Sequence, residues 1–96
     1  MKKQVNPYTN ARIGFYESRF QNQTNQQLVN EFNQLANSCG WTAERSYFSV
    51  ALINEMIQRE MDVSAISECD DRRQVISVHY VIVQYNEVSM SLVPIR

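Results

Sequence analysis

The chain's most apolar helix-length stretch runs from Thr42 to Arg59, and its hydrophobic positions fall on two sides. At about 100° per residue, one stripe consists of Tyr47, Phe48, Ala51 and Leu52, and the opposite stripe of Val50, Ile53 and Ile57. A helix that is apolar on both sides has to be covered on both sides. We therefore expect the rest of the chain, or a partner, to pack around this central helix.

A second helix is predicted to begin at Thr24, because Thr24 and Gln27 have the spacing of a capping box. Apolar residues then recur on a single face, formed by Leu28, Val29, Phe32, Leu35 and Ala36. Gly40 suits the left-handed residue that ends a helix, and Thr42 can cap the central helix that follows. The pattern predicts a helical hairpin with a short turn.

Two strands are predicted after the central helix. Residues 74–85 are rich in β-branched and aromatic residues, and hydrophobic and polar residues alternate from position 88. A tight turn at Asn86 and Glu87 would join them as a hairpin. In that register, one face carries Val81, Val83, Tyr85, Val88, Met90 and Leu92, and we expect this face to meet the central helix.

The first of these strands is also apolar on its other face, through Ile76, Val78, Tyr80 and Ile82. Strands that are apolar on both faces usually lie inside a sheet. Pro94 places the second strand at an edge, because proline cannot donate to the ladder. The missing neighbour should therefore pair with the free side of residues 74–85, and either residues 12–20 or a partner chain could supply it.

Residues 12–20 fit two patterns. Ile13 and Phe15 alternate as in a strand, whereas Tyr16 and Phe20 have helical spacing that Gly14 opposes. The strand is the preferred interpretation. Residues 1–10 are polar and predict a flexible arm, and residues 67–73 predict a charged connector. The predicted fold is α+β: a two-helix hairpin packed on a small antiparallel sheet made of the C-terminal β-hairpin, with residues 12–20 as a candidate N-terminal strand.

Composition limits the possible functions. A chain of 96 residues allows one domain, spanning residues 1–96, and 44% hydrophobic with 20% charged residues is ordinary for a folded protein. A net charge of −1 provides no general attraction for nucleic acid or an anionic membrane. We see no signal peptide and no apolar run of the ~20 residues that span a bilayer. These features predict a cytoplasmic protein with reduced Cys39 and Cys69.

Catalytic motifs are sparse. His79 is the only histidine, and its obvious candidate partners are Cys39, Cys69, Asp70 and Asp71. Zinc sites need paired cysteine or histidine spacings, which the chain lacks, and two glycines do not make a phosphate-binding loop. We therefore expect no enzyme, no metal and no cofactor.

The surplus apolar surface favours a small interaction or regulatory protein that binds itself as a homodimer or binds another protein. The predicted interface combines the second helix stripe with the outer face of the first strand. It consists of Val50, Ile53, Ile57, Tyr80 and Ile82.

A DNA-binding dimer is the alternative. A short strand followed by two helices around a glycine turn resembles the ribbon-helix-helix proteins, over about half of the chain. This outline is carried by Thr24 and Leu28, Leu35-Ala36, Gly40, and Val50-Ala51-Leu52. Three residues separate the candidate strand from the next helix, where that fold turns tightly. The resemblance implies Arg12 and Arg19 as nucleic-acid contacts, but the acidic balance of the chain makes nucleic acid the less favoured partner.

Overall fold

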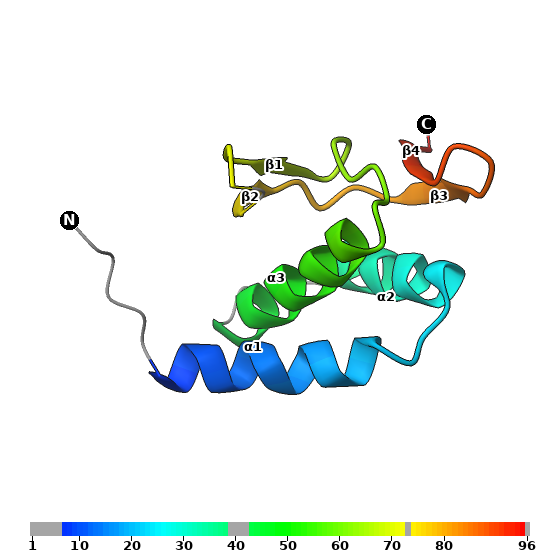
Figure 1. Cartoon of the computed structure of the whole chain (residues 1–96). Helices are drawn as coiled ribbons and strands as arrows, with labels where there is room; N and C mark the ends of the chain where they lie inside the picture. Colours follow the sequence, from blue (N-terminus) through cyan, green and yellow to red (C-terminus); the bar gives the residue numbers. More distant parts are fainter. Residues whose placement is uncertain (1–6, 39–42, 73, 96) are drawn as a thin grey trace.

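The computed structural model describes residues 7–38, 43–72 and 74–95, and within them it has an α+β fold. The helices are α1 (Pro7–Phe20), α2 (Asn25–Asn37) and α3 (Ala43–Gln58), and the strands are β1 (Ser67–Cys69), β2 (Val75–Val78), β3 (Val83–Asn86) and β4 (Ser91–Pro94). In Figure 1, α3 lies between α1 on one side and the layer of strands on the other. The predicted fold class, with its C-terminal hairpin, is confirmed.

Both apolar stripes of α3 are covered within the chain. On one side, the Phe48 ring makes edge-to-face contacts with Tyr16 and Phe20 of α1, at centroid distances of 5.2 and 5.1 Å. On the other side, Ile53 has no exposed surface, and the residues around it face the strand layer. The central helix is thus the middle of the core, as its two stripes require.

The expectation of a strand at residues 12–20 is wrong, because these residues belong to α1. Ile13, Tyr16 and Phe20 pack against or within the core, whereas Phe15 is 59% exposed, so its alternation with Ile13 was misleading. Gly14 weakens the helix by only about 1 kcal/mol, which packing of the other residues outweighs. Residues 7–10 of the expected flexible arm also belong to α1, and the rest of that arm lies outside the described residues.

The capping box of α2 is present. Thr24 Oγ1 accepts a hydrogen bond from the Gln27 N–H (3.1 Å), and Gln27 Oε1 accepts one from the Thr24 N–H (2.8 Å). The helix ends at Asn37, and Ser38 follows in an extended conformation. The predicted roles of Gly40 and Thr42 fall outside the described residues.

The end of α3 has the hydrogen bonds of a Schellman motif. Glu60 adopts φ 62°, its N–H donates to Ile57, and the Met61 N–H reaches back to the Met56 carbonyl. Met56 and Met61 are both buried and supply the hydrophobic contact typical of this motif. The chain therefore turns sharply from the helix into the strand layer without a glycine.

The long strand expected at residues 74–85 is divided into β2 and β3. The missing neighbour of β2 is β1, with Ser67 opposite Val78 and Cys69 opposite Val75, across a bulge. This pairing corrects the prediction that residues 67–73 form only a connector. The strand layer consequently contains two separate two-stranded antiparallel sheets within the described residues.

The C-terminal hairpin has a longer loop than predicted. Tyr85 lies opposite Leu92 rather than Val88, because Asn86 Oδ1 accepts hydrogen bonds from the N–H groups of Val88 and Ser89 and holds a wider turn. The new register is displaced by an even number of residues, so Tyr85 and Leu92 still share one face. The predicted neighbour of this face was the central helix, whereas β3 contacts α2. Val83 and Leu92 are buried on this face, but Val81 and Val88, which were also predicted to belong to it, are exposed.

Other parts of the chain cover both outer edges of this hairpin. On the free side of β3, the side-chain amide of Asn33 accepts from the Val83 N–H (2.9 Å) and donates to the Val83 carbonyl (2.8 Å). On the free side of β4, the Asp62 main chain donates to Met90 and accepts from Leu92. The sheet of β3 and β4 is therefore anchored to α2 on one side and to the segment after α3 on the other.

Candidate functional site

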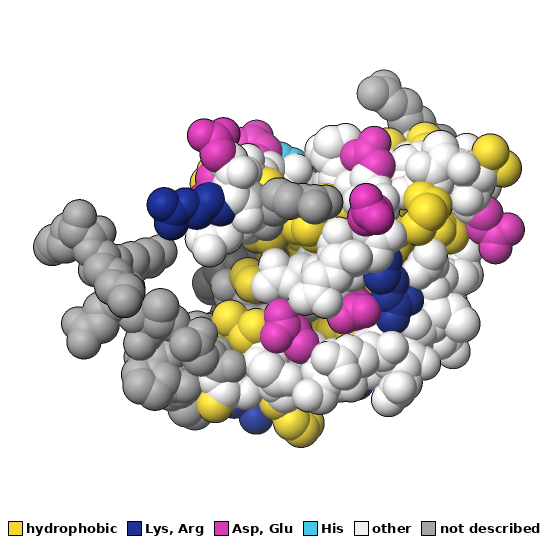
Figure 2. Space-filling model, in the orientation of Figure 1, with side chains coloured by type: hydrophobic (Ala, Val, Ile, Leu, Met, Phe, Trp, Pro, Cys, Tyr) yellow, Lys and Arg dark blue, Asp and Glu magenta, His cyan; other side chains and the backbone are white. Residues whose placement is uncertain are grey.

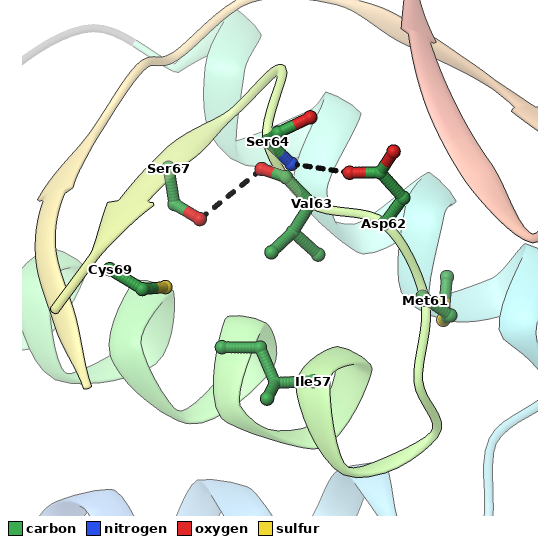
Figure 3. Close-up of a pocket in the computed structure, with 7 residues that line it drawn as sticks. All are labelled: Ile57, Met61, Asp62, Val63, Ser64, Ser67 and Cys69. Carbon is green, nitrogen blue, oxygen red and sulfur yellow. Dashed lines mark hydrogen bonds between the residues drawn. The ribbon is translucent and has the colours of Figure 1, made fainter. Parts of the chain in front are cut away.

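The contact between α3 and the β1–β2 sheet leaves a hollow on each side. The α3–β1 hollow has a volume of about 250 Å³ and is lined by Ile57, Met61, Asp62, Val63, Ser64, Ser67 and Cys69 (Figure 3). The α3–β2 hollow has a volume of about 280 Å³ and is lined by Ser46, Ser49, Val50, Val75, Ile76, Ser77, Val78 and Tyr80. Figure 2 shows hydrophobic side chains at the surface between the strand layer and the helices.

Polar side chains that line the α3–β1 hollow form hydrogen bonds to nearby main-chain groups of the turn between α3 and β1. Asp62 Oδ1 accepts a hydrogen bond from the Ser64 N–H (3.0 Å), which holds the pKa of Asp62 below its ordinary value. The Ser67 hydroxyl donates to the Val63 carbonyl (3.2 Å). Both interactions are drawn in Figure 3, where Ile57 and Val63 point into the space between α3 and β1. The hollow therefore has an apolar floor and a rim whose serine and aspartate groups stabilise the turn.

Tyr80 forms one wall of the α3–β2 hollow and is held on three sides. Its ring stacks on Phe32 at 6.2 Å with an interplanar angle of 5°, and the Arg45 guanidinium lies 4.2 Å from the ring centroid. The Ser49 hydroxyl donates to the Arg45 carbonyl (2.7 Å), so Tyr80 is the donor in the 2.9 Å bond between the two hydroxyls. Phe32, Arg45 and Ser49 thus fix the position of the Tyr80 ring.

The predicted interface residues do not form one surface. Val50 and Tyr80 come together in the α3–β2 hollow, whereas Ile57 lines the α3–β1 hollow. The Ile82 carbonyl accepts from the Ile95 N–H, which places Ile82 and Ile95 together on the outer face of the β3–β4 sheet. Ile53 is fully buried in the single chain, so it cannot contact a second chain unless the core rearranges. The strand layer covers the stripe that we expected a partner to cover.

Sequence reasoning missed the exposure of Ile76. We assigned it to the second apolar face of an interior strand, but its side chain is 66% exposed at the rim of the α3–β2 hollow. The bulge opposite Cys69 alters the alternation of side chains at this point, and nothing in the local sequence marks it.

Arg12, one of the two candidate nucleic-acid contacts, binds Glu44 at the start of α3. Its Nε and Nη2 lie 2.9 and 3.2 Å from the two carboxylate oxygens, and the Tyr16 hydroxyl donates to the same carboxylate at 2.6 Å. These bonds lower the pKa of Glu44, and the bond to Glu44 raises the pKa of Tyr16. Arg12 therefore joins α1 to α3.

Arg19, the other candidate, lies 2.8 Å from the Glu31 carboxylate on α2 and over the Phe20 and Phe48 rings. Both cations thus have partners inside the molecule. The strand on which the ribbon-helix-helix resemblance depended is also a helix. Among the described residues, the two cations on which the DNA-binding alternative depended are therefore used within the chain.

The residues considered for catalysis are separated along the β1–β2 sheet. Cys69 is exposed and lies opposite Val75, whereas His79 follows Val78 at the other end of the ladder. His79 Nε2 lies 3.6 Å from the Glu68 carboxylate, and both side chains are well exposed. Among the described residues, no three histidine, cysteine, aspartate or glutamate side chains gather as a metal site would require. Cys39 lies outside the described residues.

No family model, curated protein or solved structure matches the chain. Among the described residues, no helix has the length and hydrophobicity needed to cross a membrane.

Proposed function

We propose that this protein is a small noncatalytic interaction protein of the cytoplasm, and that it binds a second copy of itself through the surface around the α3–β2 hollow. The observation that carries the proposal is the position of Ile76, a large aliphatic side chain that is 66% exposed beside an apolar hollow. Aromatic and aliphatic anchors next to well-formed pockets are the usual centres of protein interfaces.

The surroundings of the α3–β2 hollow have the composition of an interface core. Residues 74–85 contain no aspartate, glutamate, lysine or arginine, and the α3 residues that line the hollow are Ser46, Ser49 and Val50. Depletion of charged residues distinguishes the centre of an interface from the remaining surface. The residues that line the hollow therefore carry no charge that the interface would have to dehydrate.

A second copy is the partner that suits this surface best. The same patch supplies both a protruding Ile76 and a hollow with an apolar wall at Val50. A two-fold axis would place each Ile76 near the hollow of the other copy, and closed two-fold dimers are the commonest oligomers. A net charge of −1 gives the two copies little reason to repel each other.

Light scattering across a concentration series tests the proposal. We expect the mass of the wild type to rise from monomer to dimer between about 10 µM and 1 mM, the weak range of a small interface. Ile76→Asp should remain monomeric with an unchanged circular dichroism spectrum, because Ile76 is exposed. The matched control is Val88→Asp, at a residue that is 97% exposed in the other sheet, and it should dimerise like the wild type. A monomeric wild type throughout the series would overturn the proposal.

The noncatalytic part of the proposal is supported by the separation of Cys69 from His79 and by the local use of Asp62 and Ser67. The exposed thiol of Cys69 suits the reducing cytoplasm. The test is the double variant His79→Ala with Cys69→Ala in any activity that the purified protein displays. If that variant folds normally but loses turnover, the noncatalytic proposal is wrong.

A further inference from the structure

The main-chain groups of Val78 point away from β1. In an antiparallel ladder, hydrogen-bonded pairs alternate with pairs that are not bonded to each other. The His79 N–H donates to the Ile66 carbonyl, so His79 and Ser77 point toward β1, and Val78 between them points to the other side. Outside the β1–β2 ladder, no described residue bonds to the Val78 N–H or carbonyl. The outer edge of β2 is therefore open within the described part of the chain.

The other strand edges are occupied or charged. Asn33 bonds the free side of β3, and Asp62 bonds the free side of β4. The β1 side of the first sheet carries the acidic residues Glu68, Asp70 and Asp71, which would repel another copy of the same strand. By contrast, β2 has no charged residue and no proline, the features with which proteins usually protect an exposed edge.

We infer that β2 pairs with the β2 of a second copy, in antiparallel orientation, to make one four-stranded sheet. This inference rests on the proposed function and specifies how the two copies meet. The two-fold axis passes beside Ser77, so that Ser77 faces its own copy and Val78 exchanges main-chain hydrogen bonds with Ile76 of the second chain. Pairing that adds strands to a sheet draws its affinity from main-chain bonds and its specificity from alternate side chains.

The pairing also accounts for a weakness of the isolated fold. A two-stranded sheet is marginal in water, whereas four strands with a covered face are stable. The β1–β2 sheet packs on α3 and the core through residues such as Val75 and Val78. Joining two such sheets edge to edge gives β2 a second neighbour, on the side opposite β1.

A symmetric disulfide tests the register. In a background of Cys39→Ser with Cys69→Ser, Ser77→Cys should form a covalent dimer under mild oxidation. The pairing places the two residues at a position without mutual hydrogen bonds, about 4.5 Å apart at Cα, which a disulfide can span. Gln74→Cys is the matched control in the same segment. Its two copies would lie about 20 Å apart at 3.3 Å per residue, so it should not crosslink.

Hydrogen exchange provides a test without mutation. We expect the Val78 amide to become at least tenfold better protected as the protein is concentrated from about 10 µM to 1 mM. The His79 amide, which already donates to Ile66, is the internal control and should gain much less. A light-scattering dimer in which Ser77→Cys fails to crosslink and Val78 gains no protection would overturn the strand pairing and leave the proposed function standing. A protein that stays monomeric would overturn both.

Discussion

Arg59 joins the ends of the three helices, and its removal is the most informative perturbation of the fold. Its guanidinium donates to the Glu55 carboxylate (2.8 Å) and to the Asn25 side-chain oxygen (2.9 Å). It also donates to the carbonyls of Phe20 (3.1 Å) and Gln21 (3.4 Å), at the end of α1. One side chain thus binds the C-terminal end of α1, the first turn of α2 and the last turn of α3.

The variant Arg59→Met keeps most of the apolar stem and removes every donor. The Glu55 side chain is only 10% exposed, so its carboxylate would lose its cation in a largely dehydrated position. Breaking a buried pair costs about 3–5 kcal/mol, and an unsatisfied carbonyl adds about 1 kcal/mol. Because 20% of the Arg59 side chain is exposed, water offsets part of this cost. We expect the free energy of unfolding to fall by about 3 kcal/mol and the melting temperature by about 15 °C.

Urea denaturation followed by circular dichroism measures this loss. Arg59→Lys keeps the charge but not the planar set of donors, and it should lose about half as much stability. Arg72→Met, at an exposed residue, is the control and should change stability by less than about 0.5 kcal/mol. Glu55→Met combined with Arg59→Met should cost less than Arg59→Met alone, because no carboxylate is then left without its partner. A loss below about 1 kcal/mol for Arg59→Met would refute the reasoning.

Two further predictions concern Glu60 and Glu44. Glu60→Gly should raise the free energy of unfolding by about 1 kcal/mol, because Glu60 adopts φ 62° and only glycine does so without strain. Urea titrations measure this free energy, and an unchanged or lower value would contradict the prediction. The bonds from Arg12 and Tyr16 hold the pKa of Glu44 below its ordinary value of 4.5. These bonds therefore stabilise the folded state fully above pH 4.5, and this stabilisation is lost as the pH falls through the lowered pKa. The difference in unfolding free energy between the wild type and Glu44→Gln should therefore shrink in acid, and a difference independent of pH would contradict the assignment.

Elements with local signals could be predicted from the sequence. The capping box of Thr24 and Gln27 needs only residues three apart, and the structure contains it. The two stripes of α3 likewise depend on spacing within one helix, and both are covered. The predicted placement of Tyr85 and Leu92 on one face of the C-terminal hairpin is correct despite the error in the loop, because an even displacement of the register keeps paired residues on the same side of the sheet. Val88 is the exception, since the wider loop removes it from the strand and leaves it exposed.

Elements decided by distant contacts could not be predicted in this way. The helix at residues 12–20 competes with a strand pattern of similar local quality, and packing on Phe48 is one of the contacts that favour the helix. The sequence also contains no signal for the C-terminal end of α3, because Glu60 rather than glycine occupies the left-handed position there. Its strain is tolerated because Met61 is buried beyond it, a fact that depends on the strand layer.

The candidate site differs from the predicted interface because it too depends on contacts between distant parts of the chain. The apolar residues of α3 outnumber those needed to hold one neighbouring layer, and this surplus suggested a partner for Ile53. Ile53 is instead fully buried within the chain. The strand β1 begins with Ser67 and Glu68, whose polarity gives no sign that a strand starts there. Pairing of β1 with β2 then brings β2 over α3 and leaves Ile76 exposed at the bulge. Exposed apolar surface thus includes Ile76 beside the edge of β2. In the proposed dimer, a strand edge constrains the partner more strongly than a helix surface would. A helix stripe would accept any apolar face, whereas the proposed pairing at the Val78 N–H and carbonyl would select an extended chain with its own donors and acceptors in register.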